Sequence, residues 1–194
     1  MISLNEMSND LTNIITKDLD YNDDKKEIVA YAIETSLHSV IGVLLLILFA
    51  LLVGAVKTAL IAAVFGVILR RFSGGAHFDT PTKCLIFGAI LYSGLGVLTQ
   101  KLVEYRVVTD LMLWACLGVA LIIVSILAPV DSANKPIHSA KLKRNLKGLS
   151  IAFVIVSFVI VLISSNAMLN VSLSLGILYQ SLTLLPLFNH GGGG

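Results

Sequence analysis

Long apolar runs separated by short polar segments decide what this chain can fold into. A helix that crosses hydrocarbon needs roughly 20 apolar residues, and in lipid only helices and closed barrels pair all their backbone groups. We therefore predict an all-α integral membrane protein with about six transmembrane helices. Because two of the runs are short, four full spans with a re-entrant pair is the alternative. The runs are Leu37–Val56, Thr58–Leu69, Leu85–Leu98, Leu111–Val130, Leu149–Ser165 and Met168–Phe188.

Composition supports the same class of protein. Of the 194 residues, 56% are hydrophobic and 13% are charged, whereas soluble domains carry about 25% charged residues. The mean hydropathy is +0.89. The charges are also unevenly distributed, because residues 1–36 contain eight acidic residues and three lysines, and the remainder contains four acidic and eleven basic residues. An acidic N-terminal region therefore precedes a basic membrane domain.

The first 36 residues are expected to form a separate cytoplasmic region. Leu4, Met7, Leu11, Ile14 and Ile15 recur at helical spacing, which predicts an amphipathic helix. That helix lies either at the membrane surface or against the cytoplasmic face of the protein. A loop over residues 18–24 then leads into a second helix, and the acidic N-terminus predicts no cleaved signal peptide. We expect a transmembrane domain over residues 37–188 and a tail over residues 189–194, whose four glycines we leave aside.

Basic residues predict the orientation in the membrane. Cytoplasmic loops carry an excess of lysine and arginine. With six spans and a cytoplasmic N-terminus, the two basic loops both lie on the cytoplasmic side of the membrane. One contains Arg70, Arg71 and Lys83, and the other contains Lys135, Lys141, Lys143, Arg144 and Lys147.

The polar segment from Arg70 to Cys84 lies between two apolar runs and is the best candidate for a functional site. Polar groups are costly beside lipid, so such a segment usually serves a function. A thiol becomes nucleophilic when a base or a positive field favours the thiolate, and His77 precedes Cys84 by seven residues. We expect a loop that carries His77 and a helix that starts near Thr80 or Thr82. That start places Cys84 in the first turns, where the helix dipole stabilises a thiolate.

Neighbouring residues are candidates for supporting roles. Arg71 and Lys83 supply positive charge, and Gly74 and Gly75 allow close approach of a peptide. Asp79 is a candidate to orient the imidazole, and a helix cap or a partner for Arg70 is the alternative interpretation.

Other chemistries find less support in the sequence. His77, Asp79, Cys84 and His138 could hold a metal, but their spacing matches no zinc pattern. We therefore expect no metal and no cofactor, and neither a phosphate-binding loop nor a serine elbow is present. The basic residues of the later loop either mark orientation or attract anionic lipid or an acidic peptide tail. Cys116 lies in an apolar run as a packed thiol, and the two cysteines suggest no disulfide.

The same residues resemble a known family. Arg70-Arg71, then Gly75-Ala76-His77, then Cys84 are similar to the AgrB (accessory gene regulator) family of bacterial membrane endopeptidases. Ala128-Pro129, Lys135-Pro136-Ile137 and Thr183-Leu184-Leu185-Pro186 are also similar to that family. The resemblance covers the chain from about Leu37 to Phe188.

The resemblance implies a cysteine endopeptidase that processes a short quorum-sensing propeptide of the AgrD type at the cytoplasmic face of the cell membrane. By position, Cys84 is the nucleophile that forms an acyl-enzyme thioester, and His77 is the general base and then the acid. Arg71 and Gly75 match positions linked to activity. The peptide then closes to a thiolactone or lactone, and the enzyme works as a homodimer among membrane lipids, with no role for nucleic acid. The alternatives are a non-catalytic peptide transporter or export accessory, and an intramembrane metallopeptidase.

Overall fold

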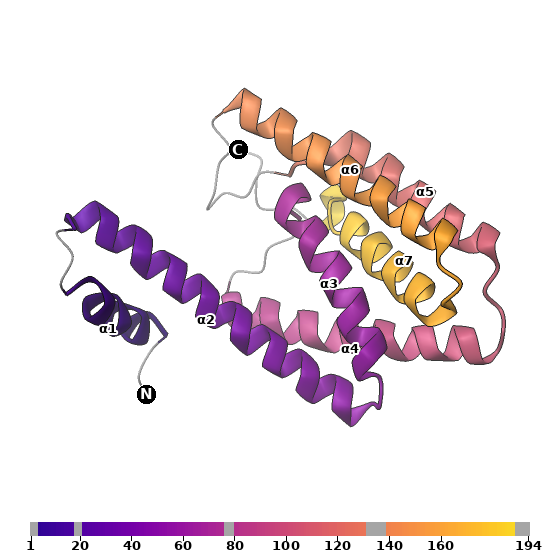
Figure 1. Ribbon diagram of the computed structural model, residues 1–194, viewed down its shortest axis with the longest axis horizontal. Coiled ribbons are helices and arrows are strands. Elements are labelled where there is room, and N and C mark those ends of the chain that lie inside the picture. The colour runs from indigo at the N-terminus through magenta and orange to yellow at the C-terminus, as the bar shows by residue number, and fades with distance from the viewer. Residues whose placement is uncertain (1–3, 18–20, 76–79, 131–138, 189–194) are drawn as a thin grey trace. The chain divides into compact units, whose positions relative to one another are not determined.

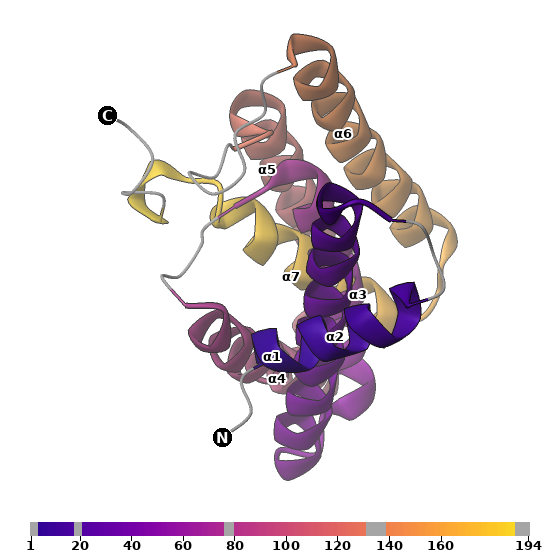
Figure 2. The same ribbon diagram turned by 90° about the vertical axis from the view of Figure 1, so that its left-hand side faces the viewer.

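The computed structural model describes residues 4–17, 21–75, 80–130 and 139–188, and these are all helical or irregular, with no strand among them. This confirms the predicted all-α class. Figures 1 and 2 show the helices in two views at right angles. They are α1 (Leu4–Thr16), α2 (Asp23–Leu52), α3 (Val56–Ser73), α4 (Pro81–Glu104), α5 (Asp110–Leu127), α6 (Ala140–Ile163), α7 (Ala167–Leu182) and the short 3₁₀ helix η1 (Pro186–Phe188).

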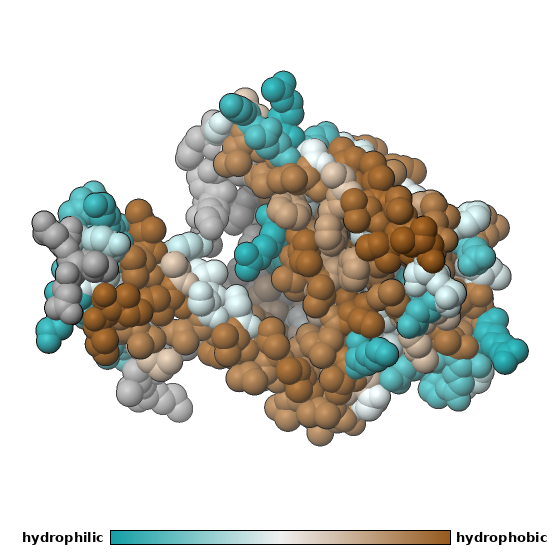
Figure 3. All heavy atoms as spheres, in the orientation of Figure 1, coloured by the Kyte–Doolittle hydropathy of each residue, from teal (hydrophilic) through white to brown (hydrophobic). Residues whose placement is uncertain are grey.

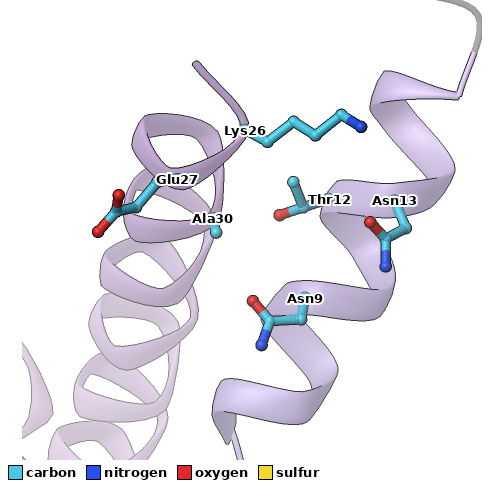
Figure 4. A pocket seen from close by; sticks show the side chains of 6 residues that line it. All are labelled: Asn9, Thr12, Asn13, Lys26, Glu27 and Ala30. Carbon is cyan, nitrogen blue, oxygen red and sulfur yellow. The ribbon is translucent and has the colours of Figure 1, made fainter. Parts of the chain in front are cut away.

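The chain forms two compact units, Met1–Leu45 and Leu46–Gly194. In the first unit, α1 packs on the early turns of α2 through small hydroxyl side chains: Ser8, Thr12 and Thr16 are buried, and Ser8 Oγ donates to the Ala30 carbonyl at 2.6 Å. The predicted N-terminal helix is therefore confirmed, and its apolar side chains Met7, Ile14 and Ile15 stay exposed. A polar surface pocket between the two helices is lined by Asn9, Thr12, Asn13, Lys26, Glu27 and Ala30 (Figure 4).

Helix α7 forms the centre of the second unit. It contacts α3, α4, α5 and α6, and Figure 1 shows it between α3 and the α5–α6 pair. The core around it includes Leu69 of α3, Leu117 of α5 and Ile177 of α7, all fully buried. Since α7 touches four other helices, any polar group on it is held in a fixed position relative to all of them.

Small residues bring these helices into close contact. A Cβ atom built on Gly176 of α7 would collide with the Ala62 carbonyl of α3, and one built on Gly96 of α4 would meet Ala59. The Thr58 hydroxyl donates to the Gly96 carbonyl at 3.0 Å. Helices in lipid associate largely through such close van der Waals packing and interhelical hydrogen bonds, so these contacts fix α3 between α4 and α7.

Four of the described helices, α2, α4, α5 and α6, are long and apolar enough to cross a membrane. Helix α3 carries Arg70 and Arg71 in its last turn, and α7 has only 16 residues. The expected six apolar helices are thus present, but four of them meet the length and composition of a span. Their outer side chains are widely exposed, as at Ile163 with 80% of its surface accessible. Figure 3 shows this apolar surface, with hydrophilic side chains at the N-terminal end of α6.

One predicted boundary is wrong. The basic residues at 141–147 were expected in a loop, but α6 begins at Ala140 and includes them. Ser139 caps this helix, since its hydroxyl accepts from the Leu142 amide at 3.4 Å, and lysine, arginine and leucine are good helix formers. We call Lys141, Lys143, Arg144 and Lys147 the basic turns of α6.

Candidate active site

Helix α4 presents Cys84 in its first turns. Thr80 is the N-cap residue, Pro81 occupies the first helical position, and the Cys84 amide donates to the Thr80 carbonyl at 3.3 Å. Proline is favoured there because its missing N–H would have no partner in the helix. The predicted helix start is therefore confirmed. The thiol therefore lies close to the positive end of the helix dipole.

Arg70 is the basic residue that reaches the thiol. It lies in the last turn of α3, and its Nη2 atom donates to Cys84 Sγ at 3.9 Å. Both side chains are partly buried, whereas Arg71 and Lys83 are exposed. A guanidinium beside a sulfur atom stabilises its ionised form. The sequence predicts positive charge from Arg71 and Lys83, and the structure adds a contact from Arg70.

The turn after α3 is held from two distant parts of the chain. Gly74 and Gly75 have φ angles of 69° and 142°, which glycine adopts far more readily than other residues. On one side, the Val130 amide donates to the Ser73 carbonyl at 2.9 Å. On the other side, Gln180 Nε2 donates to the Gly74 carbonyl at 2.8 Å. We call residues 73–75 the glycine turn.

Two tyrosines connect α4 to α7. The rings of Tyr92 on α4 and Tyr179 on α7 meet edge to face, with centroids 5.6 Å apart. A Cβ atom on Gly66 would collide with the Tyr92 hydroxyl, so Gly66 makes the space for that ring. Arg70 and Cys84 lie within electrostatic range of both tyrosines. The contact between these two rings thus joins α4 to α7.

The structure brings Arg70 into contact with Cys84, and the glycine turn follows Arg70 at the end of α3, where the Gly74 amide donates to the Arg70 carbonyl at 3.0 Å. His77, Asp79, Lys135 and His138 lie outside the described residues. The basic turns of α6 are near the end of α5, where three of their side chains line a surface pocket with Ala128 and Pro129. Both cysteines are free, and no group of three metal-binding side chains occurs among the described residues.

Sequence reasoning missed Gln180, Tyr92 and Tyr179. The signal for Gln180 was available, because an amide side chain within an apolar helix is rare and usually functional. Nothing in the sequence showed that it would meet Gly74, which is 106 residues away in the chain.

Comparison with known proteins identifies the family of the chain. The family model of accessory gene regulator B (AgrB) matches residues 8–184, which include the whole of α2 to α7. The chain belongs to this family. A putative AgrB-like protein of Clostridium perfringens (strain SM101 / Type A) is 25% identical over 96% of this chain and 93% of its own. The accessory gene regulator protein B of Staphylococcus epidermidis is 31% identical over 64% of each chain.

A putative AgrB-like protein of Lactiplantibacillus plantarum is 28% identical, over 84% of this chain and 80% of its own. No solved structure matches the chain at a significant level. The family resemblance seen in the sequence is therefore confirmed. Membership, together with the apolar helices, establishes a helical membrane protein of the accessory gene regulator B family.

Proposed function

We propose that this AgrB-family protein is a membrane cysteine endopeptidase that processes a short AgrD-like propeptide. The observation that carries the proposal is the setting of Cys84: a thiol in the first turns of α4 with the Arg70 guanidinium 3.9 Å away. Positive charge and a helix N-terminus together are the surroundings in which cysteines become nucleophiles. A thiol that served only for packing would not need either.

The reaction would begin with proton transfer from the Cys84 thiol to His77. The thiolate then attacks a peptide carbonyl carbon, the C–N bond breaks, and the imidazolium returns the proton to the leaving amine. The amino-terminal part of the peptide stays on Cys84 as a thioester. A cysteine or serine side chain of that same peptide then attacks the thioester carbonyl. Its own proton passes to the released Cys84 sulfur through His77, and the ring closes as a thiolactone or lactone.

A membrane site suits the second half of this reaction. A thioester hydrolyses if water reaches it, so excluding water protects the intermediate until the ring closes. Cys84 is partly buried at the end of a helix that is apolar enough to cross a membrane. From the positive-inside rule we infer that this end of α4 and the N-terminus lie in the cytoplasm, which is where a newly made propeptide would be met. A homodimer among membrane lipids remains part of the proposal.

The basic turns of α6 are the proposed binding surface for an acidic peptide tail. Lys141, Lys143 and Arg144 are exposed, and the N-terminal end of α6 carries the hydrophilic side chains that Figure 3 shows. Charges of this kind attract an oppositely charged partner and orient it as it binds. They add no catalytic group, so their effect is confined to substrate capture.

A cleavage assay with two matched cysteine variants tests the proposed function. The purified protein in lipid is mixed with a synthetic AgrD-like propeptide, and the products are followed by chromatography. We expect Cys84→Ala to abolish cleavage and Cys116→Ala to retain it, because Cys116 lies in α5, away from the site. Cleavage that survives in Cys84→Ala, or that a chelator abolishes in the native protein, would contradict the cysteine mechanism.

A further inference from the structure

Gln180 is a buried polar side chain to which the proposed mechanism gives no role. It lies in the last turn of α7 and is completely buried. Burying an amide group costs free energy unless its hydrogen bonds are made, and a leucine would fill an apolar helix at no such cost. The presence of glutamine at this position therefore needs a reason.

The described contacts of Gln180 include the glycine turn and the end of α7. Its Nε2 atom donates to the Gly74 carbonyl at 2.8 Å. A Cβ atom built on Gly75 would lie 2.9 Å from Nε2 and 2.7 Å from Thr183 Oγ1, so the turn is packed directly on this amide. The Thr183 hydroxyl in turn donates to the Gln180 carbonyl at 2.7 Å, which holds the end of α7 in place.

The glycine turn connects the two parts of the proposed site. It follows Arg70, which contacts the Cys84 thiol, and it precedes the segment that contains His77. Val130 holds the turn at Ser73 and Gln180 holds it at Gly74. Only one residue separates Gly75 from His77 in the sequence, so the turn is the last described part of the chain before the proposed base.

Gln180 Oε1 is buried and has no hydrogen-bond partner among the described residues. Within the described part of the chain, the N–H group is therefore the half of the amide that makes a hydrogen bond, the one to the Gly74 carbonyl.

We propose that Gln180 is a positioning residue of the peptidase reaction. Its N–H group holds the Gly74 carbonyl and so fixes the turn that leads from Arg70 to His77. The inference rests on the proposed function, since it assigns Gln180 to that same site. Its loss is expected to slow formation of the acyl-enzyme and to leave propeptide binding unchanged, because the Gln180 side chain is completely buried.

Asn170 offers a matched control on the same helix. It is also a buried amide, its Nδ2 atom donates to a main-chain carbonyl, that of Ser164, at 2.8 Å, and its Oδ1 atom also lacks a partner in the described part of the chain. It lies in the first turn of α7, at the opposite end from the glycine turn. Asn170→Leu therefore repeats the loss of a buried amide without touching the site.

The first experiment compares single-turnover acylation by Gln180→Leu, Asn170→Leu and native protein, using a synthetic AgrD-like propeptide. A misplacement of catalytic groups by about 1 Å lowers a rate by about 100-fold. We therefore expect acylation by Gln180→Leu to be 10- to 100-fold slower than by native protein, with an unchanged KM. Asn170→Leu should acylate at the native rate. Equal acylation rates in the two leucine variants would overturn the inference.

A second variant, Gln180→Glu, keeps the size of the side chain and supports a direct test of the donor. A protonated carboxyl group can donate to the Gly74 carbonyl, and an ionised one cannot. The ratio of Gln180→Glu activity to native activity should therefore be highest at low pH and fall as the pH rises. A ratio that is independent of pH while the carboxyl group titrates would contradict the role of the donor.

Hydrogen exchange separates failure of this inference from failure of the proposed function. If the native protein never acylates, the peptidase proposal fails, whatever Gln180 does. Exchange of the amides around residues 74–84 still reports positioning in that case: faster exchange in Gln180→Leu than in Asn170→Leu supports the hold on the turn. Identical exchange in the two variants overturns it.

Discussion

Replacing Gly75 by alanine should damage the site in a way that the structure lets us estimate. The new Cβ atom would lie 2.7 Å from Thr183 Oγ1, where ordinary contacts begin at 3.4 Å, a deficit of 3.4 − 2.7 = 0.7 Å. Its φ angle of 142° is also one that alanine rarely adopts, which costs about 1–3 kcal/mol. Overpacking adds about 1–3 kcal/mol. The turn, or the Thr183 and Gln180 side chains that hold it, must therefore shift by about 0.7 Å, and the backbone strain at φ 142° remains.

The functional consequence follows from the size of that movement. A displacement near 1 Å at catalytic groups costs about 100-fold in rate, so Gly75→Ala should lower the propeptide cleavage rate by 10- to 100-fold. Initial cleavage rates and thermal unfolding in detergent measure the two effects. Gly88→Ala on α4 is the control, because nothing lies within 4 Å of its new Cβ atom. The double variant with Thr183→Ala should recover part of the loss, since the backbone strain remains. A native cleavage rate and native stability in Gly75→Ala would refute this reasoning.

Three further predictions concern the thiol, the helix packing and the substrate. Alkylation of Cys84 can be measured alone in a Cys116→Ala background. There, Arg70→Leu should slow the alkylation by about tenfold, equivalent to about 1.4 kcal/mol, whereas Lys57→Leu at the other end of α3 should leave the rate unchanged. Equal rates in the two variants would show that the guanidinium does not activate the thiol. Gly176→Ala should destabilise the protein by about 1–3 kcal/mol, because its Cβ atom meets the Ala62 backbone, and an unchanged unfolding midpoint would contradict the close packing. Neutralising the basic turns of α6 should raise KM at constant kcat, with an effect that weakens as salt increases; unchanged kinetics would remove the electrostatic role.

Local features of the site could be predicted because their physical causes are local. Proline is favoured at the first position of a helix, so Pro81 predicts a helix start there. The placement of Cys84 in the first turns of α4 follows from that start. The turn at 164–166 was likewise predictable, because Asn166 is a strong N-cap residue and its Oδ1 atom accepts from the Leu169 amide at 3.1 Å.

Long-range features could not be predicted. In helices that are apolar on all sides, the sequence pattern does not show which face meets a neighbour. The hydrogen bond from Gln180 to Gly74 and the choice of Arg70 over Arg71 as the partner of Cys84 depend on how α3 and α7 are rotated about their axes. Close contacts at small residues such as Gly176 set that rotation, and they become visible only when the helices are packed together.

The most direct test of the account is the intact mass of the protein after brief mixing with an AgrD-like propeptide in lipid. We predict an added mass equal to the amino-terminal part of the peptide on native protein, none on Cys84→Ala, and release of the adduct by a small thiol, as a thioester requires. Cleavage without any adduct, or an adduct that persists in Cys84→Ala, would contradict the central claim that Cys84 carries the acyl group.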